Sequence, residues 1–304
     1  MMRHIVDSAH GGAEPNSPAD HQRPASGDAG ATTALSTPST FAANGHAREL
    51  RAGMGVNDTK PILDQARPKT PRISVVIPTL NEAKNLPHVF AKLPSDIYEI
   101  VLVDGNSTDD TVEVARELYP DVRIVGQSGR GKGNALKAGF NACRGDIIVM
   151  LDADGSADGN EIPRFVEALL NGADFAKGSR FIEGGGSADI TRLRRLGNAF
   201  LSGLVNLLYR TSYSDLCYGY NAFWASCLPV INVDCDGFEV ETLINIRVAK
   251  AGLVVTEVPS FELDRIHGES NLRTFRDGFR VLKTIVGELR REPITASAVS
   301  ATAG

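Results

Sequence analysis

The sequence predicts an α/β fold, with a doubly wound, mainly parallel sheet flanked by helices. Between residues 73 and 151, short β-branched runs alternate with helical segments, as in parallel sheets joined by crossover helices. The run 147–151 is apolar throughout, which is typical of a strand buried on both faces. It ends abruptly on Asp152 and Asp154, and ligands of open α/β sheets gather at the carboxyl ends of the strands.

Composition places the chain among ordinary globular proteins. It has 304 residues, 42% hydrophobic and 23% charged, and its formal net charge of -5 gives no reason to expect nucleic acid as a partner. The four cysteines form no C-x-x-C pair, which predicts buried thiols in a reducing compartment. There is no secretory h-region and no apolar run of about 18 residues. We therefore expect a cytoplasmic protein that does not span a membrane.

One ordered domain is predicted between two tails. Residues 1–70 are rich in Ala, Gly, Ser, Thr, Pro and Asp and have few large apolar side chains. Such a segment cannot bury enough surface to offset its ordering entropy, so we expect it to be disordered. Residues 293–304 predict a second short tail, which leaves 71–292 as the folded domain.

The elements follow from the periodicity of apolar residues. The β-branched run 73–78 predicts the first strand, and Asn85 is a candidate N-cap for a helix over 85–93. The strand 99–103 comes next and ends on Asp104. The remaining predicted elements are helix 109–118, strand 122–125, a helix up to residue 143, strand 147–151, helices 161–170 and 196–209, a strand and turn at 215–225, helix 237–250, strand 254–259 and helix 274–291.

The loop 129–134 is rich in glycine and carries Arg130 and Lys132 before a helix. It is not a P-loop, because Gly133 stands where Ser or Thr is needed, and it is not a dinucleotide fingerprint, because Asn134 replaces the last glycine. Glycines still let backbone N–H groups approach an anion at a helix N-terminus, where both cations add charge. The alternative is a purely structural loop.

Two clusters of charge are candidate sites. Asp152 and Asp154, two residues apart at a strand end, can share a hard cation, and Mg²⁺ typically brings substrate phosphates with it; the alternative is a turn that merely ends the strand. The basic residues that precede and open the helix 196–209 could bind phosphate, lie on a membrane surface, or form the solvated end of a core helix. These basic residues are Arg192, Arg194 and Arg195.

Four motifs resemble, in their order along the chain, those of the family 2 glycosyltransferases with a GT-A fold. They are Val76-Ile77-Pro78-Thr79-Leu80-Asn81-Glu82, Val103-Asp104-Gly105-Asn106-Ser107, Gly131-Lys132-Gly133-Asn134 and Leu151-Asp152-Ala153-Asp154. Residues 178–181, Arg194-Arg195, 237–241 and 265–272 are similar to the dolichol-phosphate mannose synthase branch. The resemblance covers about residues 72–290. It departs from the pattern at Gly105, Gly155 and Asn271, where many members have Asp, an apolar residue and Lys.

The resemblance implies inverting transfer of a hexose from a nucleotide sugar, GDP- or UDP-linked, to a polyprenyl phosphate at the inner face of a membrane. The implied donor-binding residues are Pro78, Asn81, Glu82, Asp104 and Asn106, which Arg130 and Lys132 of the glycine-rich loop would join. The implied ligands of Mg²⁺ or Mn²⁺ are Asp152, Asp154 and Ser156. The implied acceptor-phosphate residues are Arg180, which we also expect to act in catalysis, and Arg194, Arg195, Arg265 and Ser270.

Other acceptors and activities stay open. A phosphate acceptor is already an anionic nucleophile, whereas a hydroxyl acceptor (a sugar, an alcohol or a natural product) needs a carboxylate base, for which Glu239 and Glu241 are the candidates. Being two residues apart, these two cannot share one helix face, so at most one is expected to face a site. The further alternatives are a nucleotidyltransferase and a non-catalytic nucleotide-sugar binding module.

Overall fold

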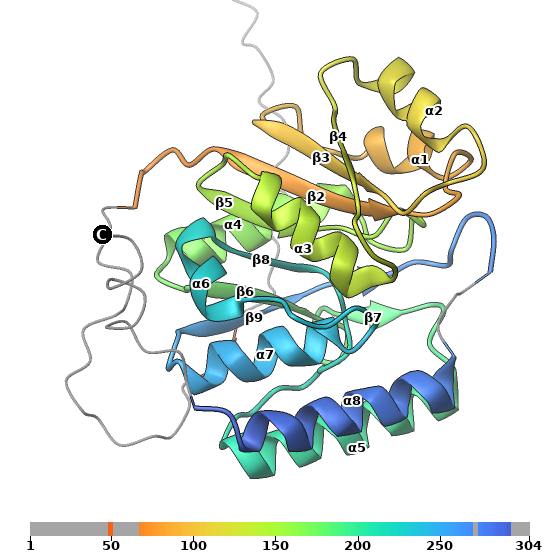
Figure 1. Cartoon of the computed structure of the whole chain (residues 1–304). Helices are drawn as coiled ribbons and strands as arrows, with labels where there is room; N and C mark the ends of the chain where they lie inside the picture. Colours follow the sequence, from red (N-terminus) through yellow and green to blue (C-terminus); the bar gives the residue numbers. More distant parts are fainter. Residues whose placement is uncertain (1–47, 51–66, 270–272, 293–304) are drawn as a thin grey trace, which may run out of the picture. The chain divides into compact units, whose positions relative to one another are not determined.

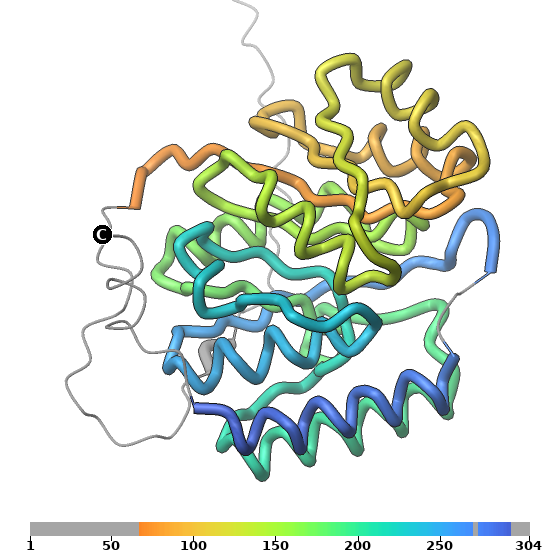
Figure 2. The backbone as a smooth tube through the Cα atoms, in the orientation of Figure 1, coloured from red at the N-terminus to blue at the C-terminus, as the bar shows by residue number. Residues whose placement is uncertain are grey.

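The central feature of the fold is one sheet of eight strands. The computed structural model describes residues 48–50, 67–269 and 273–292 (Figures 1 and 2). The strand order is β1-β9-β6-β8-β5-β2-β3-β4, and β10 and β7 form a separate pair. The strands are β1 Arg48–Leu50, β2 Ile73–Thr79, β3 Glu99–Asp104, β4 Arg123–Gly126, β5 Ile147–Met150, β6 Phe175–Ser179, β7 Gly186–Ser187, β8 Asn221–Trp224, β9 Val255–Pro259 and β10 Phe261–Glu262.

The predicted mainly parallel sheet is confirmed. Strands β5, β2, β3 and β4 are parallel neighbours, as are β6 and β9. Two strands run the other way: β8 is antiparallel to both β5 and β6, and β1 is antiparallel to β9. β1 lies inside the segment expected to be disordered, where three residues pair with β9 through their backbone and form the edge of the sheet. The rest of that segment up to residue 66, and the predicted tail 293–304, lie outside the described residues.

The helices cover the sheet and add an outer layer. α3 packs against β2, β3 and β4, and α4 packs against β6, β8 and β9. α7 contacts both α5 and α8, and Figure 1 shows these two helices side by side, with α7 between them and the sheet. The helices are α1 Leu86–Phe90, α2 Thr111–Leu118, α3 Lys132–Ala142, α4 Ile162–Leu170, α5 Arg192–Tyr209, α6 Leu228–Ile231, α7 Val240–Lys250 and α8 Thr274–Leu289, with 3₁₀ turns at Gly159–Glu161 and Ala225–Cys227.

Burial follows the apolar runs from which the strands were predicted. All four residues of β5 are buried, and so are the apolar residues of β2 and β3 on either face. Each fully buried Val, Leu or Ile stabilises the fold by about 1.5–3 kcal/mol relative to exposure. This rigid centre fixes the strand ends from which the polar loops of the site begin.

Asn85 occupies the N-cap position of α1, as predicted, but its side chain does not make the expected hydrogen bond to a backbone N–H of the first turn. Its amide instead donates to Glu82 Oε2, at 2.5 Å, and to the carbonyl of His267, at 3.1 Å. Asn85 therefore ties the start of α1 to the loop that precedes α8.

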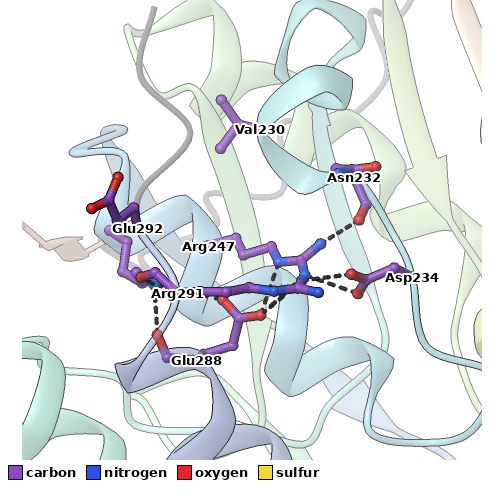
Figure 3. A pocket seen from close by; sticks show the side chains of 8 residues that line it. Val230, Asn232, Asp234, Arg247, Glu288, Arg291 and Glu292 are labelled. Carbon is purple, nitrogen blue, oxygen red and sulfur yellow. Dashed lines mark hydrogen bonds and ion pairs between the residues drawn. The ribbon is translucent and has the colours of Figure 1, made fainter. Parts of the chain in front are cut away.

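A cluster of ion pairs joins α6, α7 and α8 around Arg247 (Figure 3). Arg247 is buried, and its guanidinium donates to Glu288 at 3.0 Å and to Asp234 at 2.8 Å. It also donates to the carbonyl of Ile231 at 3.1 Å. Glu288 is buried as well, and this burial raises the pKa of its carboxyl, an effect that Lys250 opposes. Arg247 is thus the buried cation that links α6, α7 and α8, and Lys250 and Arg291 also pair with Glu288.

We expect Arg247→Leu to lower the free energy of unfolding by about 3–5 kcal/mol, because it leaves the buried carboxylate of Glu288 without its main partner. Urea denaturation followed by circular dichroism measures the change. Arg291→Leu is the matched control: Arg291 pairs with the same acids, Asp234 and Glu288, but its side chain is 54% exposed, so the expected loss is about 0–1 kcal/mol. Equal losses in the two variants would contradict the assignment.

Candidate active site

Two adjoining cavities open at the carboxyl ends of the parallel strands. The first cavity, of about 470 Å³, lies at the ends of β2, β3 and β5. The second cavity, of about 260 Å³, extends from the acidic loop after β5 to the helices α5 and α8. The residues that line both are Lys132, Asp152, Asp154, Phe238 and Arg265. A molecule in one cavity therefore meets a molecule in the other at the acidic loop.

Each carboxylate of the acidic loop is paired with a cation from a distant segment. Lys132 Nζ lies 2.6 Å from Asp152 Oδ1 and 2.8 Å from Glu241 Oε1. Arg265 Nη2 lies 2.6 Å from Asp154 Oδ2, and its Nη1 lies 3.6 Å from Glu82 Oε1. The loop is thus more than a strand-ending turn, because it holds four charged side chains from other elements together.

Lys132 is enclosed by this network. Burial by itself would lower its pKa, but the attraction of Asp152 and Glu241 outweighs burial and raises the pKa above the usual lysine value. The backbone of Gly219 closes over the group, since a Cβ there would lie only 2.8 Å from Lys132 Nζ and 3.2 Å from Glu241 Oε1. The ammonium therefore remains charged and fixed between the two carboxylates.

The loop that follows β10 packs directly on the acidic loop. The N–H of Leu263 donates to the carbonyl of Ser156 at 2.8 Å, and the N–H of Ile266 donates to the carbonyl of Asp154 at 3.3 Å. Gly155 has a φ of +80°, and a Cβ at this position would lie 2.6 Å from the side chain of Ile266. Glycine in place of the apolar residue common in the family thus permits this close approach.

Of the residues expected to bind the donor, most line the first cavity: Pro78, Glu82, Asn106, Arg130 and Lys132. Asn81 and Asp104 do not line it. Asn81 Oδ1 accepts from the N–H of Thr108 at 2.7 Å, and Asp104 accepts from the N–H groups of Asn106 and Ser107. These two side chains shape the loops after β2 and β3 that form the cavity wall.

The glycine-rich loop differs from the anion-binding loop that we expected. The N–H groups of Gly133 and Asn134 donate to the carbonyl of Asp236, at 2.9 and 3.4 Å. A Cβ on Gly131 would lie 2.2 Å from that carbonyl, and one on Gly133 would lie 2.3 Å from the carbonyl of Cys235. The glycines therefore allow the segment before α7 to pack closely on this loop, and the loop residues that line the first cavity are Arg130, Gly131 and Lys132.

The predicted acceptor residues divide into three groups. Arg180, Arg194 and Arg265 line the second cavity. Arg195 is exposed outside it, with its guanidinium over the ring of Phe181, 5.3 Å from the centroid, and Ser270 lies outside the described residues. The guanidinium of Arg180 binds Asp215 through two nitrogens, at 2.7 and 3.0 Å, and Glu262 at 2.9 Å, which leaves it neutralised in this arrangement.

Only one of the two candidate bases faces a cavity, as the helical spacing predicts. Glu241 lines the second cavity, and burial raises the pKa of its carboxyl, while Lys132 opposes this effect. Glu239 lies at the start of α7 and lines neither cavity, and its Oε1 accepts from the N–H of Gly237 at 3.2 Å.

Sequence reasoning missed Phe238, which lines both cavities, and Glu262, which fixes Arg180. Phe238 immediately precedes Glu239, the first of the two candidate bases, and an aromatic residue just before a helix start was the available signal. Glu262 lies in a two-residue strand with no periodicity, so nothing local identifies it.

The oxygen ligands offered by the acidic loop fit a divalent cation whose remaining coordination positions are filled by substrate phosphate. Asp152 and Asp154 supply carboxylate oxygens to both cavities, and the hydroxyl of Ser156 donates to Asp154 Oδ1 at 2.7 Å, which orients that carboxylate. No cluster of three or more His, Cys, Asp or Glu side chains suited to a metal occurs in the described segments. Mg²⁺ commonly binds through one or two carboxylates together with substrate phosphates, so two suffice.

Comparison with known proteins gives the family. The model of glycosyl transferase family 2 matches residues 74–227, about half of the chain. Glycosyltransferase AglJ of Haloferax volcanii is 31% identical over 214 residues, 69% of this chain and 70% of that protein. Dolichol-phosphate mannosyltransferase of Pyrococcus furiosus is 34% identical over 66% of this chain, but the match spans only 59% of that protein, less than two thirds.

A solved structure shows the same fold. Glucosyl-3-phosphoglycerate synthase from Mycobacterium tuberculosis, crystallised with Mn²⁺ and UDP, superposes with a TM-score of 0.57 at 24% identity, over 72% of this chain and 80% of that one. The predicted GT-A-type α/β fold and glycosyltransferase class are confirmed, and the nucleotidyltransferase alternative loses its support. On the family match and these relatives together, the chain belongs to glycosyl transferase family 2.

Proposed function

We propose that the protein transfers a hexose from a nucleotide sugar, GDP- or UDP-linked, to a polyprenyl phosphate at the cytoplasmic face of a membrane, with inversion at the anomeric carbon. The first cavity takes the donor and the second takes the acceptor phosphate with the first part of its chain. The Pyrococcus relative, named for dolichol phosphate and mannose, supports this class of acceptor and sugar.

The observation that carries the proposal is the absence of an available base among the described residues that line the second cavity. Glu241 is bound to Lys132 at 2.8 Å, and Glu262 is bound to Arg180 at 2.9 Å. Asp277 accepts from the N–H of Arg273 at 2.7 Å and lies 3.7 Å from Arg280. Asp189 lies 3.8 Å from Arg194, and its side chain is 47% exposed. A phosphate oxygen needs no deprotonation at neutral pH, whereas a hydroxyl acceptor does. The same cavity offers apolar contacts from Ile190, Leu193, Leu201 and Val281, which suit a hydrocarbon chain.

The reaction forms a bond between an oxygen of the acceptor phosphate and the anomeric carbon, and breaks the bond from that carbon to the diphosphate, which leaves with the nucleoside. Bound at Asp152 and Asp154, Mg²⁺ or Mn²⁺ would neutralise the charge that develops on the leaving diphosphate. Lys132 holds Asp152 in place, and Glu82 lies against Arg265 beside Asp154. These pairs preorganise the point where the two cavities meet.

We expect one nucleoside diphosphate, GDP or UDP, to stabilise the protein in a thermal-shift panel only when Mg²⁺ or Mn²⁺ is present. A ligand that binds the native state alone adds about 2.7 kcal/mol at 100 times its dissociation constant, which gives an easily measured shift. Transfer from the corresponding sugar donor is then assayed with a short-chain polyprenyl phosphate in detergent. The matched control is the polyprenol of the same chain length. Transfer to the polyprenol at an equal or higher rate would refute the phosphate acceptor and identify a hydroxyl acceptor.

A further inference from the structure

The outer face of α5 and α8 exposes large apolar side chains. Among the described residues, nine of the fifteen exposed large apolar side chains lie on these two helices. Phe275 is 83% exposed and Leu207 is 77% exposed. The others are Leu193, Leu196, Phe200, Leu208, Phe279, Val286 and Leu289. Single exposed apolar residues are common, but such a gathering marks an interaction surface.

The side chains form one stripe along each helix. On α5 they stand at positions 193, 196, 200 and 207, and on α8 at 275, 279, 286 and 289, spacings that keep each set on one face at 3.6 residues per turn. The buried residues of α5 (Asn198, Ser202 and Val205) fall on the opposite face. Both helices contact α7 and each other, and Figure 1 shows α7 between them and the sheet. Because the stripe residues are exposed, the stripes lie on the faces that are not packed on α7. We call these two stripes the apolar face.

The charges beside the apolar face have one sign. α5 contains no acidic residue, and the two acids of α8, Asp277 and Glu288, are buried. The exposed charged residues of the two helices are all basic: Arg192, Arg195, Arg276, Arg280 and Lys283. The whole chain has a net charge of -5, so this face is opposite in sign to the rest of the molecule.

We infer that the apolar face docks on the surface of an anionic lipid bilayer, an assignment that rests on the proposed function and extends it to a defined surface. Apolar side chains enter the acyl boundary while flanking Arg and Lys meet anionic headgroups. A second copy of this chain fits less well, since a symmetric contact brings two basic faces together. The second cavity opens between the same helices, with Gly197 of α5 and Gly278 of α8 in its lining, so a lipid-borne phosphate reaches it from this side. No helix in the described part of the chain is long and apolar enough to span a membrane.

The test is co-sedimentation of the full chain with phosphatidylcholine vesicles, with or without phosphatidylglycerol, and without donor or acceptor. We expect binding to the anionic vesicles, weaker binding at high salt, and at least about a 10-fold loss of partitioning in Phe275→Ser/Phe279→Ser and in Phe200→Ser/Leu207→Ser. None of these four residues lines the first or the second cavity. Leu118→Ser and Leu170→Ser are matched controls, because both side chains are exposed on other helices, and they should bind like the unaltered chain.

Three results would overturn the inference: no vesicle binding, equal loss in the controls, or a dimer in light scattering that these substitutions dissociate. The variants should keep their turnover of short-chain polyprenyl phosphate in detergent, which also shows that they fold. If vesicles bind but this transfer is absent, the acceptor assignment fails and the docking face stands. If transfer occurs without vesicle binding, the docking face fails alone.

Discussion

Asp154→Asn is expected to abolish the metal-dependent thermal shift with the nucleotide and to lower kcat by about 10²–10³-fold, which is the usual cost of losing one electrostatic contact to a developing charge. Asp154 faces both cavities, and its carboxylate is oriented by the Ser156 hydroxyl. Asparagine keeps the shape of the side chain and removes the charge that a hard cation requires. The measurements are thermal shift and initial rate across a Mg²⁺ and Mn²⁺ titration.

Asp158→Asn is the matched control for this variant. Asp158 lies in the same acidic segment but lines neither cavity, and it caps the turn Gly159–Glu161 by accepting from the N–H of Asn160 at 3.0 Å. Asparagine caps helix starts about as well as aspartate, so activity and metal response should remain. A full metal-dependent shift in Asp154→Asn would contradict its role as a ligand and leave it as the partner of Arg265 alone.

Much of the fold could be predicted because parallel strands buried on both faces appear directly as apolar runs. Residues 73–78, 99–103 and 147–151 were predicted as strands and form β2, β3 and β5 with boundaries that agree within one residue. The antiparallel direction of β8 could not be predicted in this way. Strand direction depends on the route of the long connection through α5, and the period of side chains in a strand is the same in both directions.

Most residues of the candidate site could be predicted from the sequence, but the ion pairs and hydrogen bonds between them could not. The family motifs assigned Asp152 and Asp154 to the metal and Arg265 to the acceptor phosphate, but which cation pairs with which carboxylate depends on segments far apart in the sequence. The glycine-rich loop shows the same limit: its glycines indicate that something approaches the backbone closely, but not that this is the carbonyl of Asp236. The glycines of a loop show that another group can approach its backbone closely, but only the tertiary packing determines which group does so.

Lys132→Met is expected to lower the free energy of unfolding by about 3–5 kcal/mol, because Glu241, with a side chain only 5% exposed, then holds a buried charge without its cation. Adding Glu241→Gln to this variant should restore roughly 0.5–3 kcal/mol, the usual coupling of residues in contact. Lys137→Met, at an exposed position of the same helix α3, is the matched control and should be nearly neutral. Urea denaturation of the four members of the cycle measures the coupling.

The same cycle separates a positioning role for Glu241 from that of a general base. If Glu241 only holds Lys132, and through it Asp152, then Glu241→Gln should weaken metal-dependent donor binding and raise KM for the donor, while the pH profile of kcat keeps its shape. If Glu241 removes a proton from a hydroxyl acceptor, kcat with that acceptor should instead collapse, while donor binding is retained. With Lys132 bound to both carboxylates at 2.6 and 2.8 Å, the geometry favours the first outcome, in which the acceptor already carries its own negative charge.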